Sequence, residues 1–210
     1  MINQTTIMET LSYLQGENTV PTTGVDNRRR FIQKTLEEVY RAYPWTFASA
    51  TATLTVSNSI ATLPSDLDYQ HKVYAYFYDG DDETEVYEIS EADRDGFQQN
   101  DYKFWLTPQS DGTYLLNTKD SNYSQVIVNY QTVAPEINAS IQTPFADDMT
   151  VALGARRYVK LGQNPDADIS QDEALFQKRL TENIAAVQLS RPKKMVRKIY
   201  EANDYVLGEG

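Results

Sequence analysis

The chain has 210 residues, a formal net charge of −11 at pH 7 and no cysteine. This composition excludes disulfide bonds, thiol nucleophiles and cysteine–zinc clusters, and so acidic a chain lacks the basic surface typical of nucleic-acid binders. No apolar run approaches the roughly 18 residues that a transmembrane helix requires. The first residues, MINQTTIMETLSYL, predict no signal peptide, because no basic segment precedes a long apolar one.

Two helices are predicted at the start of the chain. Ile7, Leu11 and Leu14 follow helical spacing and predict the first helix. Asp26 is suited to cap a second helix, which carries a long apolar stripe. Pro44 predicts the end of this helix, because the residue before a proline disfavours the helical backbone.

Between residues 50 and 134 the pattern changes to β-strands. Segments rich in β-branched and aromatic residues alternate with turn signals such as Asp79-Gly80 and Asp111-Gly112. The segments are TATLTVS, IATLP, HKVYAYFYDGDDETEVYEI, FWLTP, TYLLN and SQVIVNYQTV. These strand patterns and turn signals favour an antiparallel arrangement.

Helical spacing returns in the last third of the chain. Pro144 suits the first turn of a third helix, and Gly162 predicts its end. Ser170 and Glu173 have the spacing of a capping box at the start of a fourth helix, which Pro192 closes. The remaining residues show no strong pattern, so we expect an extended tail.

We therefore predict an α+β fold, in which a helical bundle platform from both chain ends carries an inserted antiparallel β domain. Residues 1–48 and 136–190 form the predicted platform, residues 49–135 the β insertion, and residues 191–210 an extended C-terminal tail that docks on a partner. The basis is a single switch of hydrophobic period from 3.6 to 2 and back. Neither pair of helices alone could bury its apolar face.

Patterns of catalytic or metal-binding residues are weak. His71 is the only histidine and would have to be the base of any Ser-His-Asp triad, yet no G-x-S-x-G elbow accompanies it. The acidic loop at residues 79–85 could attract a hard cation, but it fails the EF-hand pattern, which favours a solvated hairpin tip. No glycine-rich phosphate motif is present. We predict no catalytic, cofactor-binding or metal-binding residues and no enzyme activity.

The charges are distributed unevenly along the chain. Residues 79–95 are dominated by Asp and Glu, whereas the segment after the last helix is basic. A basic tail on an acidic protein favours docking on an acidic partner surface, or else contact with DNA phosphate, and the sequence leaves both open. The cations expected to make this contact are Arg191, Lys193, Lys194, Arg197 and Lys198, and apolar anchoring is expected from Ile199 and Tyr200.

The order of features resembles a known family. A helix ending in YPWTF (43–47) leads into ATLTV and then into the turn LPSD (63–66), and a later helix, PFADDMTVALGARRYVKL, carries small residues at 152, 154 and 155. This order resembles the head-to-tail adaptor (neck or connector) proteins of tailed bacteriophages, especially those of short-tailed phages. The resemblance spans most of the chain, and residues 69–133 match only in general character. Trp45 and Phe47 are expected to lie buried at the junction between platform and insertion.

The resemblance implies a structural virion protein of the neck between capsid and tail, assembled in the host cytoplasm. It implies a homo-oligomeric ring, commonly of twelve copies, that sits beneath the portal protein. The ring would join the portal to tail nozzle, tube or fibre proteins, and double-stranded DNA would pass through its bore. No catalysis, no cofactor and no membrane are implied.

Two other classes of function stay open. A secreted or cell-surface carbohydrate-binding β module would present Trp105 and Tyr102 to sugars, although the expected lack of a signal peptide counts against it. A hydrolase would need two carboxylates held across a cleft, which a sequence cannot reveal. The 15 tyrosines suit protein interfaces and β-strands equally well.

Overall fold

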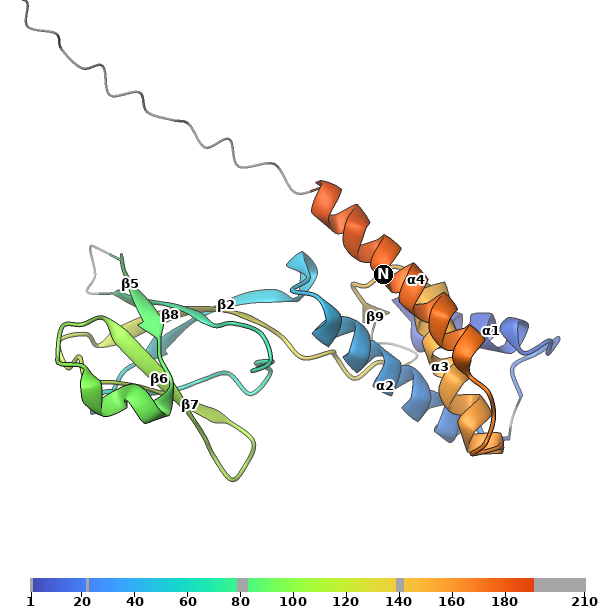
Figure 1. Ribbon diagram of the computed structural model, residues 1–210, viewed down its shortest axis with the longest axis horizontal. Coiled ribbons are helices and arrows are strands. Elements are labelled where there is room, and N and C mark those ends of the chain that lie inside the picture. Colours follow the sequence, from blue (N-terminus) through green and yellow to red (C-terminus); the bar gives the residue numbers. More distant parts are fainter. Residues whose placement is uncertain (1, 22, 79–82, 139–141, 191–210) are drawn as a thin grey trace, which may run out of the picture.

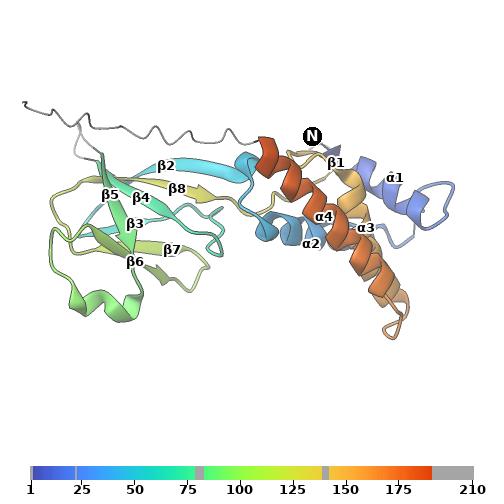
Figure 2. The same ribbon diagram turned by 45° about the horizontal axis from the view of Figure 1, so that its top comes forward.

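The protein is elongated, with helices gathered at one end and most strands at the other (Figures 1 and 2). The computed structural model describes residues 2–21, 23–78, 83–138 and 142–190. The helices are α1 (Gln4–Leu14), α2 (Val25–Ala42), α3 (Asp148–Gln163) and α4 (Ser170–Ser190), with 3-10 turns at Thr46–Ala48 and Glu91–Gly96. The strands are β1 (Ile2–Asn3), β2 (Ser49–Thr55), β3 (Ile60–Thr62), β4 (Tyr74–Tyr78), β5 (Glu83–Glu88), β6 (Lys103–Pro108), β7 (Tyr114–Thr118), β8 (Gln125–Gln131) and β9 (Gln142–Thr143).

A seven-stranded sheet dominates the structure, in the order β2-β8-β4-β5-β6-β7-β3. Its outer strands, β2 and β3, are joined by a tight turn in which Asn58 and Ser59 have positive φ angles of 51° and 64°. Two positive φ angles in succession are typical of hairpin turns that match the twist of the strands. Because one hairpin supplies both outer strands, the sheet curls until it is nearly closed.

Alternating side chains of these strands fill the interior of the curled sheet. On β8, Val126 and Val128 are fully buried and Tyr130 is nearly so, and on β4 Phe77 is fully buried. Residues between them face outward, as the two-residue period of a strand requires. This core is a separate apolar cluster from the one between the helices.

The predicted fold class is wrong. The structure is a mixed α and β protein dominated by the nearly closed sheet, and not a helical bundle platform carrying an antiparallel insertion. Strands β5 and β6 are parallel, because residues 89–102 carry the chain back to the end of the sheet where β5 began. Strands β1 and β9 also form a small sheet at the helical end. Neither feature can be predicted from the spacing of apolar residues, because the crossover is charged and the paired strands have two residues each.

The starts of three helices also differ from prediction. Helix α3 begins at Asp148, so Pro144 precedes the helix and does not lie in its first turn. Gly24, with a φ of 73°, precedes α2, so Asp26 lies inside the first turn and does not cap the helix. The amide of Glu173 donates to the Ile169 carbonyl at 2.9 Å, so Ser170 is already helical and the predicted capping box does not form. The Glu173 carboxylate instead binds Arg157, because a buried cation attracts it more strongly than a surface amide does. The domain boundaries at residues 48–49 and 135–136 stay a prediction.

Helix α3 lies at the centre of the helical end and packs against α1, α2 and α4. Gly154 permits its closest approach to α2, because a Cβ atom there would overlap the Cγ2 methyl of Thr35 and lie 3.0 Å from the ring of Phe176 on α4. The small residue therefore fixes the spacing of three helices at once. At Gly162, later on α3, an added Cβ atom would lie at an ordinary contact distance of 3.4 Å from the tip of the Phe31 ring.

Replacing Gly154 with alanine tests this spacing. We expect G154A to lower the free energy of unfolding by about 1–3 kcal/mol, as overpacking of a well-packed core does. The double variant G154A/T35S should recover much of the loss, because serine removes the clashing methyl and keeps the hydroxyl that donates to the Phe31 carbonyl at 2.9 Å. The measurement is denaturant unfolding, with G162A as the matched control on α3. Equal stability of G154A and wild type would contradict the close approach.

Candidate functional site

The junction between α2 and β2 is built around Trp45. The indole is 1% exposed and its Nε1 donates to the Val39 carbonyl at 2.7 Å. Its ring stacks on Phe47 with centroids 5.5 Å apart and meets Phe145 edge-on at 5.4 Å. Phe47 is half-buried. One aromatic cluster thus joins the end of α2 to the start of β2 and to the segment that precedes α3.

Hydrogen bonds tie the sheet into the same junction. The Tyr130 hydroxyl donates to Asp66 at 3.1 Å, and the amide of Val133 donates to the Asp66 carbonyl at 2.8 Å. The His71 Nε2 atom lies 3.3 Å from the Tyr40 carbonyl at the end of α2. These contacts lock the connections between the two ends, and they give His71 a structural role in holding a loop to a helix.

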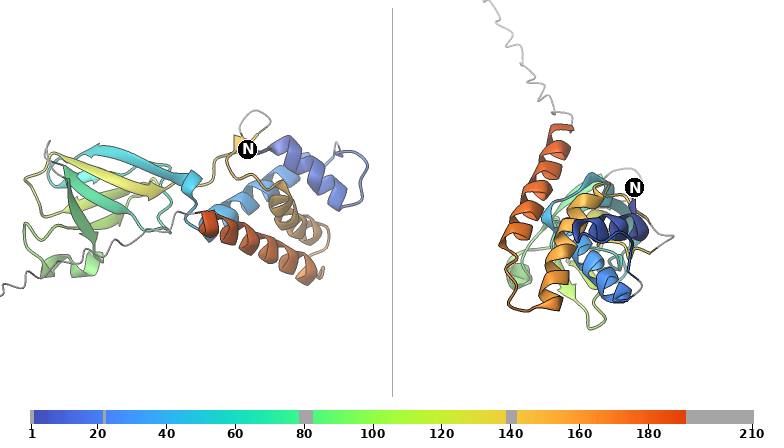
Figure 3. Two further views of the ribbon diagram at one scale, coloured as in Figure 1. Left: turned by 90° about the horizontal axis from the view of Figure 1, so that it is seen from above. Right: turned by 90° about the vertical axis from the view of Figure 1, so that its right-hand side faces the viewer.

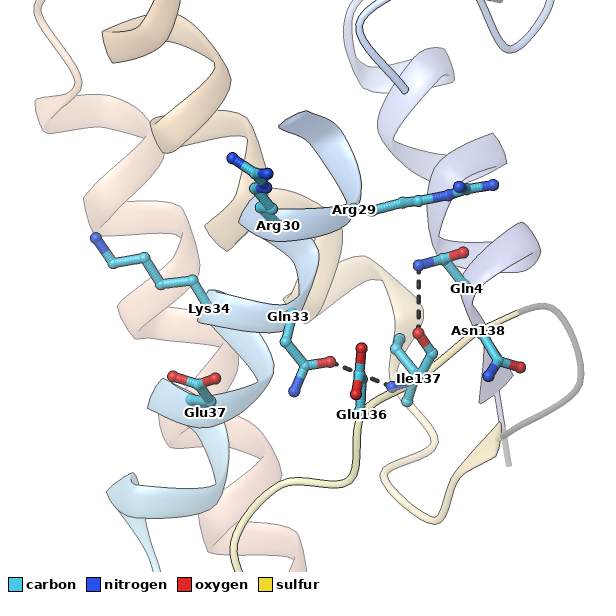
Figure 4. A pocket seen from close by; sticks show the side chains of 9 residues that line it. All are labelled: Gln4, Arg29, Arg30, Gln33, Lys34, Glu37, Glu136, Ile137 and Asn138. Carbon is cyan, nitrogen blue, oxygen red and sulfur yellow. Dashed lines mark hydrogen bonds between the residues drawn. The ribbon is translucent and has the colours of Figure 1, made fainter. Parts of the chain in front are cut away.

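A basic groove opens on the side of the helical end, with a volume of about 930 Å³ (Figure 4). It lies between α1, α2 and the segment that follows β8. The residues that line it are Gln4, Arg29, Arg30, Gln33, Lys34, Glu37, Glu136, Ile137 and Asn138. We call it the α2 groove.

Two glutamine side chains form the wall of the α2 groove (Figure 4). Gln33 donates to the Pro135 carbonyl at 3.2 Å and accepts from the Ile137 amide at 3.2 Å, which imitates the pairing of a neighbouring strand. Gln4 donates to the Ile137 carbonyl at 3.3 Å from the other side. An extended segment is therefore held between two helices, and its backbone groups are satisfied as burial requires.

The rim of the α2 groove carries cations that are accessible from solvent. Arg30 is exposed and makes no ion pair within the described residues, and Arg29 has only an exposed pair with Asp26 at 3.3 Å. Lys34 places its Nζ atom 4.1 Å from the centre of the Tyr158 ring. Exposed pairs of this kind contribute little to stability. The rim can therefore exchange such partners for acidic groups on another molecule.

An ion network anchors α4 to the other helices. Arg157 on α3 is 6% exposed, lies 2.6 Å from Glu38 on α2 and also binds Glu173 on α4. Burial alone would lower the pKa of Arg157, but its hydrogen bonds to the two carboxylates raise it. Burial, together with the hydrogen bond to Glu38, raises the pKa of Tyr158 to about 12. The guanidinium and phenol therefore keep their protons at all physiological pH values.

Asp147 is a second anchor for α4. Its carboxylate accepts from Arg179 at 2.9 Å and 3.2 Å, from Asn183 at 2.8 Å and from Thr150 at 2.7 Å. Burial alone would raise the pKa of Asp147, but these hydrogen bonds and the charge of Arg179 hold it below its usual value. The ionised carboxylate therefore supports the packing of α4 on α3.

Some of the other residues predicted from the sequence lie within the described part of the chain, and some do not. Arg191, Lys193, Lys194, Arg197, Lys198, Ile199 and Tyr200, the predicted docking residues, lie outside the described residues, as do residues 79–82 of the acidic loop. Across the described ranges, no group of three or more His, Asp or Glu side chains could hold a metal ion. The Trp105 ring is half-buried and lies edge-on to Phe97, with the ring centroids 5.8 Å apart.

Sequence reasoning missed the α2 groove and the Arg157 anchor. The groove depends on two glutamines that meet residues 135–137, more than a hundred positions later, and no local pattern predicts such a contact. The anchor did leave a signal, because Arg156 and Arg157 interrupt the apolar positions of a buried helix. A cation among buried positions predicts carboxylate partners on neighbouring helices.

Comparison with protein-family models gives no match, and comparison with curated proteins gives none either. Among the helices within the described ranges, none is both long enough and apolar enough to span a membrane.

Truncating Trp45 tests the aromatic junction. We expect Trp45→Ala to lower the free energy of unfolding by about 3–5 kcal/mol, because a fully buried ring and its hydrogen bond are both lost. Phe47→Ala should cost less, since that ring is only half-buried. Both values come from denaturant unfolding followed by circular dichroism. A change near zero for Trp45→Ala would show that the cluster does not join the two ends.

The lowered pKa of Asp147 predicts a dependence of stability on pH. Because the folded pKa lies below the unfolded value of about 3.9, the carboxylate contributes its full stability above that value and loses it as the pH falls through the folded pKa. We expect Asp147→Asn to cost about 1–2 kcal/mol at pH 7 and much less near pH 2. Unfolding curves at both pH values measure this, and a pH-independent difference would contradict the assignment.

Proposed function

We propose that this chain is a structural head-to-tail adaptor of a tailed bacteriophage, which forms a ring beneath the portal protein and joins it to the tail. The observation that carries the proposal is the two-ended subunit, in which a helical end and a nearly closed sheet are linked through the buried Trp45 junction. A protein that links two different partners in series needs two separate binding ends and a stiff connection between them. The order of sequence motifs supports the same function.

The charge of the sheet end suits a DNA conduit. Exposed carboxylates follow one another along β5 and the 3-10 turn after it, and the cation among them is Arg94. The carboxylates are Glu83, Glu85, Glu88, Glu91, Asp93 and Asp95. A wall that repels phosphate cannot trap a passing duplex, because nucleic-acid affinity depends on neutralising phosphates with cations.

The helical end suits a ring subunit. A closed ring uses a heterologous contact, so each subunit needs two different lateral faces. Helix α4 lies along one side of the helical end, and α1 and α2 lie along the other (Figure 3). In this proposal the helical end and the basic residues that follow α4 meet the portal, and the sheet end meets tail proteins.

Removing the residues after Ser190 tests the proposed portal contact. We expect the truncated chain to fold with an unchanged melting temperature, because the two apolar clusters lie within residues 2–187. It should no longer join purified portal rings, whereas the full chain should do so. The measurement is co-sedimentation with portal rings at moderate salt.

A control variant separates charge from chain length. Replacing the five cations after Ser190 with serine keeps the length and should weaken attachment to the portal as the truncation does. If the truncated chain attaches as well as the full chain, those residues are not the dock. Retained portal binding combined with lost DNA binding would assign the cations to DNA phosphate.

A further inference from the structure

The outer face of α4 is exposed and partly apolar. Leu175 and Leu189 are 42% and 87% exposed, which is high for leucine in a folded chain. Between them, Lys178 and Glu182 stand one helical turn apart on the same face and make no ion pair within the described residues. The outer face of α4 is therefore exposed to solvent and free to contact another molecule.

The opposite side of the helical end carries the complementary pattern. Asp26 and Arg30 on α2 are exposed and also stand one helical turn apart, but with the charges in the reverse order along the chain. Both Lys178-to-Glu182 and Asp26-to-Arg30 span four residues, or about 6 Å along a helix axis. Two parallel helices in this register would place each charge beside an opposite one.

The arrangement of the two helices fits a rotational contact between copies. Helices α2 and α4 run in the same general direction, from the far tip of the helical end toward the sheet (Figures 1 and 3). They lie on opposite sides of the helical end when it is viewed end-on (Figure 3). Rotation about a ring axis by a small angle nearly preserves direction, so α4 of one copy would meet α2 of the next in a nearly parallel orientation.

We propose that the occupant of the α2 groove is α4 of a second copy of this chain. In this contact Glu182 lies beside Arg30 of the next copy, and Lys178 lies beside its Asp26. Ala185 and Ala186 permit close approach of the helices, and Leu189 reaches the groove near Glu37. The inference rests on the proposed ring, whose lateral interface it specifies.

The exposed Arg29–Asp26 pair offers little resistance to this contact. Both side chains are largely open to solvent, at 53% and 86% exposed, so the pair is weak and Asp26 can turn to a new cation. Across an interface, opposite charges set the register and like charges oppose association. The matched spacing therefore selects one register of α4 along α2.

Charge reversal at one position on each face tests the contact. Arg30→Glu and Glu182→Arg each place like charges together, and we expect each variant alone to raise the concentration at half-assembly at least about tenfold. The double variant R30E/E182R restores opposite charges and should assemble like wild type. An equimolar mixture of the two single variants should also assemble, because every contact in an alternating ring is then complementary. Arg94→Glu, on the sheet end, is the matched control and should assemble like wild type.

Sedimentation velocity and native mass spectrometry give the assembled state of each sample, and thermal unfolding confirms that these exposed substitutions leave the fold intact. Wild-type assembly that neither single variant weakens overturns the inference and leaves the proposed function standing. Weakening without rescue in the mixture or the double variant also overturns it and assigns the cations to another ligand, such as DNA phosphate. A wild-type chain that stays monomeric at every concentration overturns it as well. If the charge-restored samples assemble into open filaments or dimers, the α4–α2 contact is supported but the proposed ring is contradicted.

Discussion

The arrangement of the helical end depends on one buried cation. Arg157 lies at the centre of α3, and its charge is neutralised by Glu38 from α2 and Glu173 from α4. A buried charge is costly unless it is paired, so the two carboxylates cannot leave without a large loss of stability. Because α4 supplies one of them, its place beside α3 is fixed in spite of a large exposed face. The position of that free face, on which the proposed contact between copies depends, therefore follows from Arg157.

Packing around Trp45 explains why the molecule has two separate ends. Pro44 stops α2, and Trp45 immediately buries its indole against Phe47 and Phe145. The chain can then leave for the sheet only in the direction that this cluster allows. On the return, the amide of Thr132 donates to the Ala48 carbonyl at 2.8 Å and holds the second connection beside the first. Two anchored connections resist bending better than one, which suits a part that transmits position between partners.

The sequence predicts elements in which apolar side chains repeat with a regular period. It does not predict contacts between residues that are far apart in the chain. Apolar spacing around Leu11 predicts a helix that the structure contains, and the sequence shows Gly154 as a small residue but not its partner Thr35. The parallel β5–β6 pair and the closure of the sheet could not be predicted, because they arise from a charged crossover and from a hairpin that returns β3 to β7. The α2 groove depends on Gln33 meeting residues 135–137, a tertiary contact that leaves no local trace.

If this chain links a portal to a tail as a ring, as proposed, the mass of its complex with the portal reveals the ring. Native mass spectrometry of the full chain mixed with purified portal rings gives the number of copies bound. We expect one saturable complex with a fixed number of adaptor copies and no partly filled species at saturation. A full chain that stays monomeric and leaves the portal mass unchanged would contradict it.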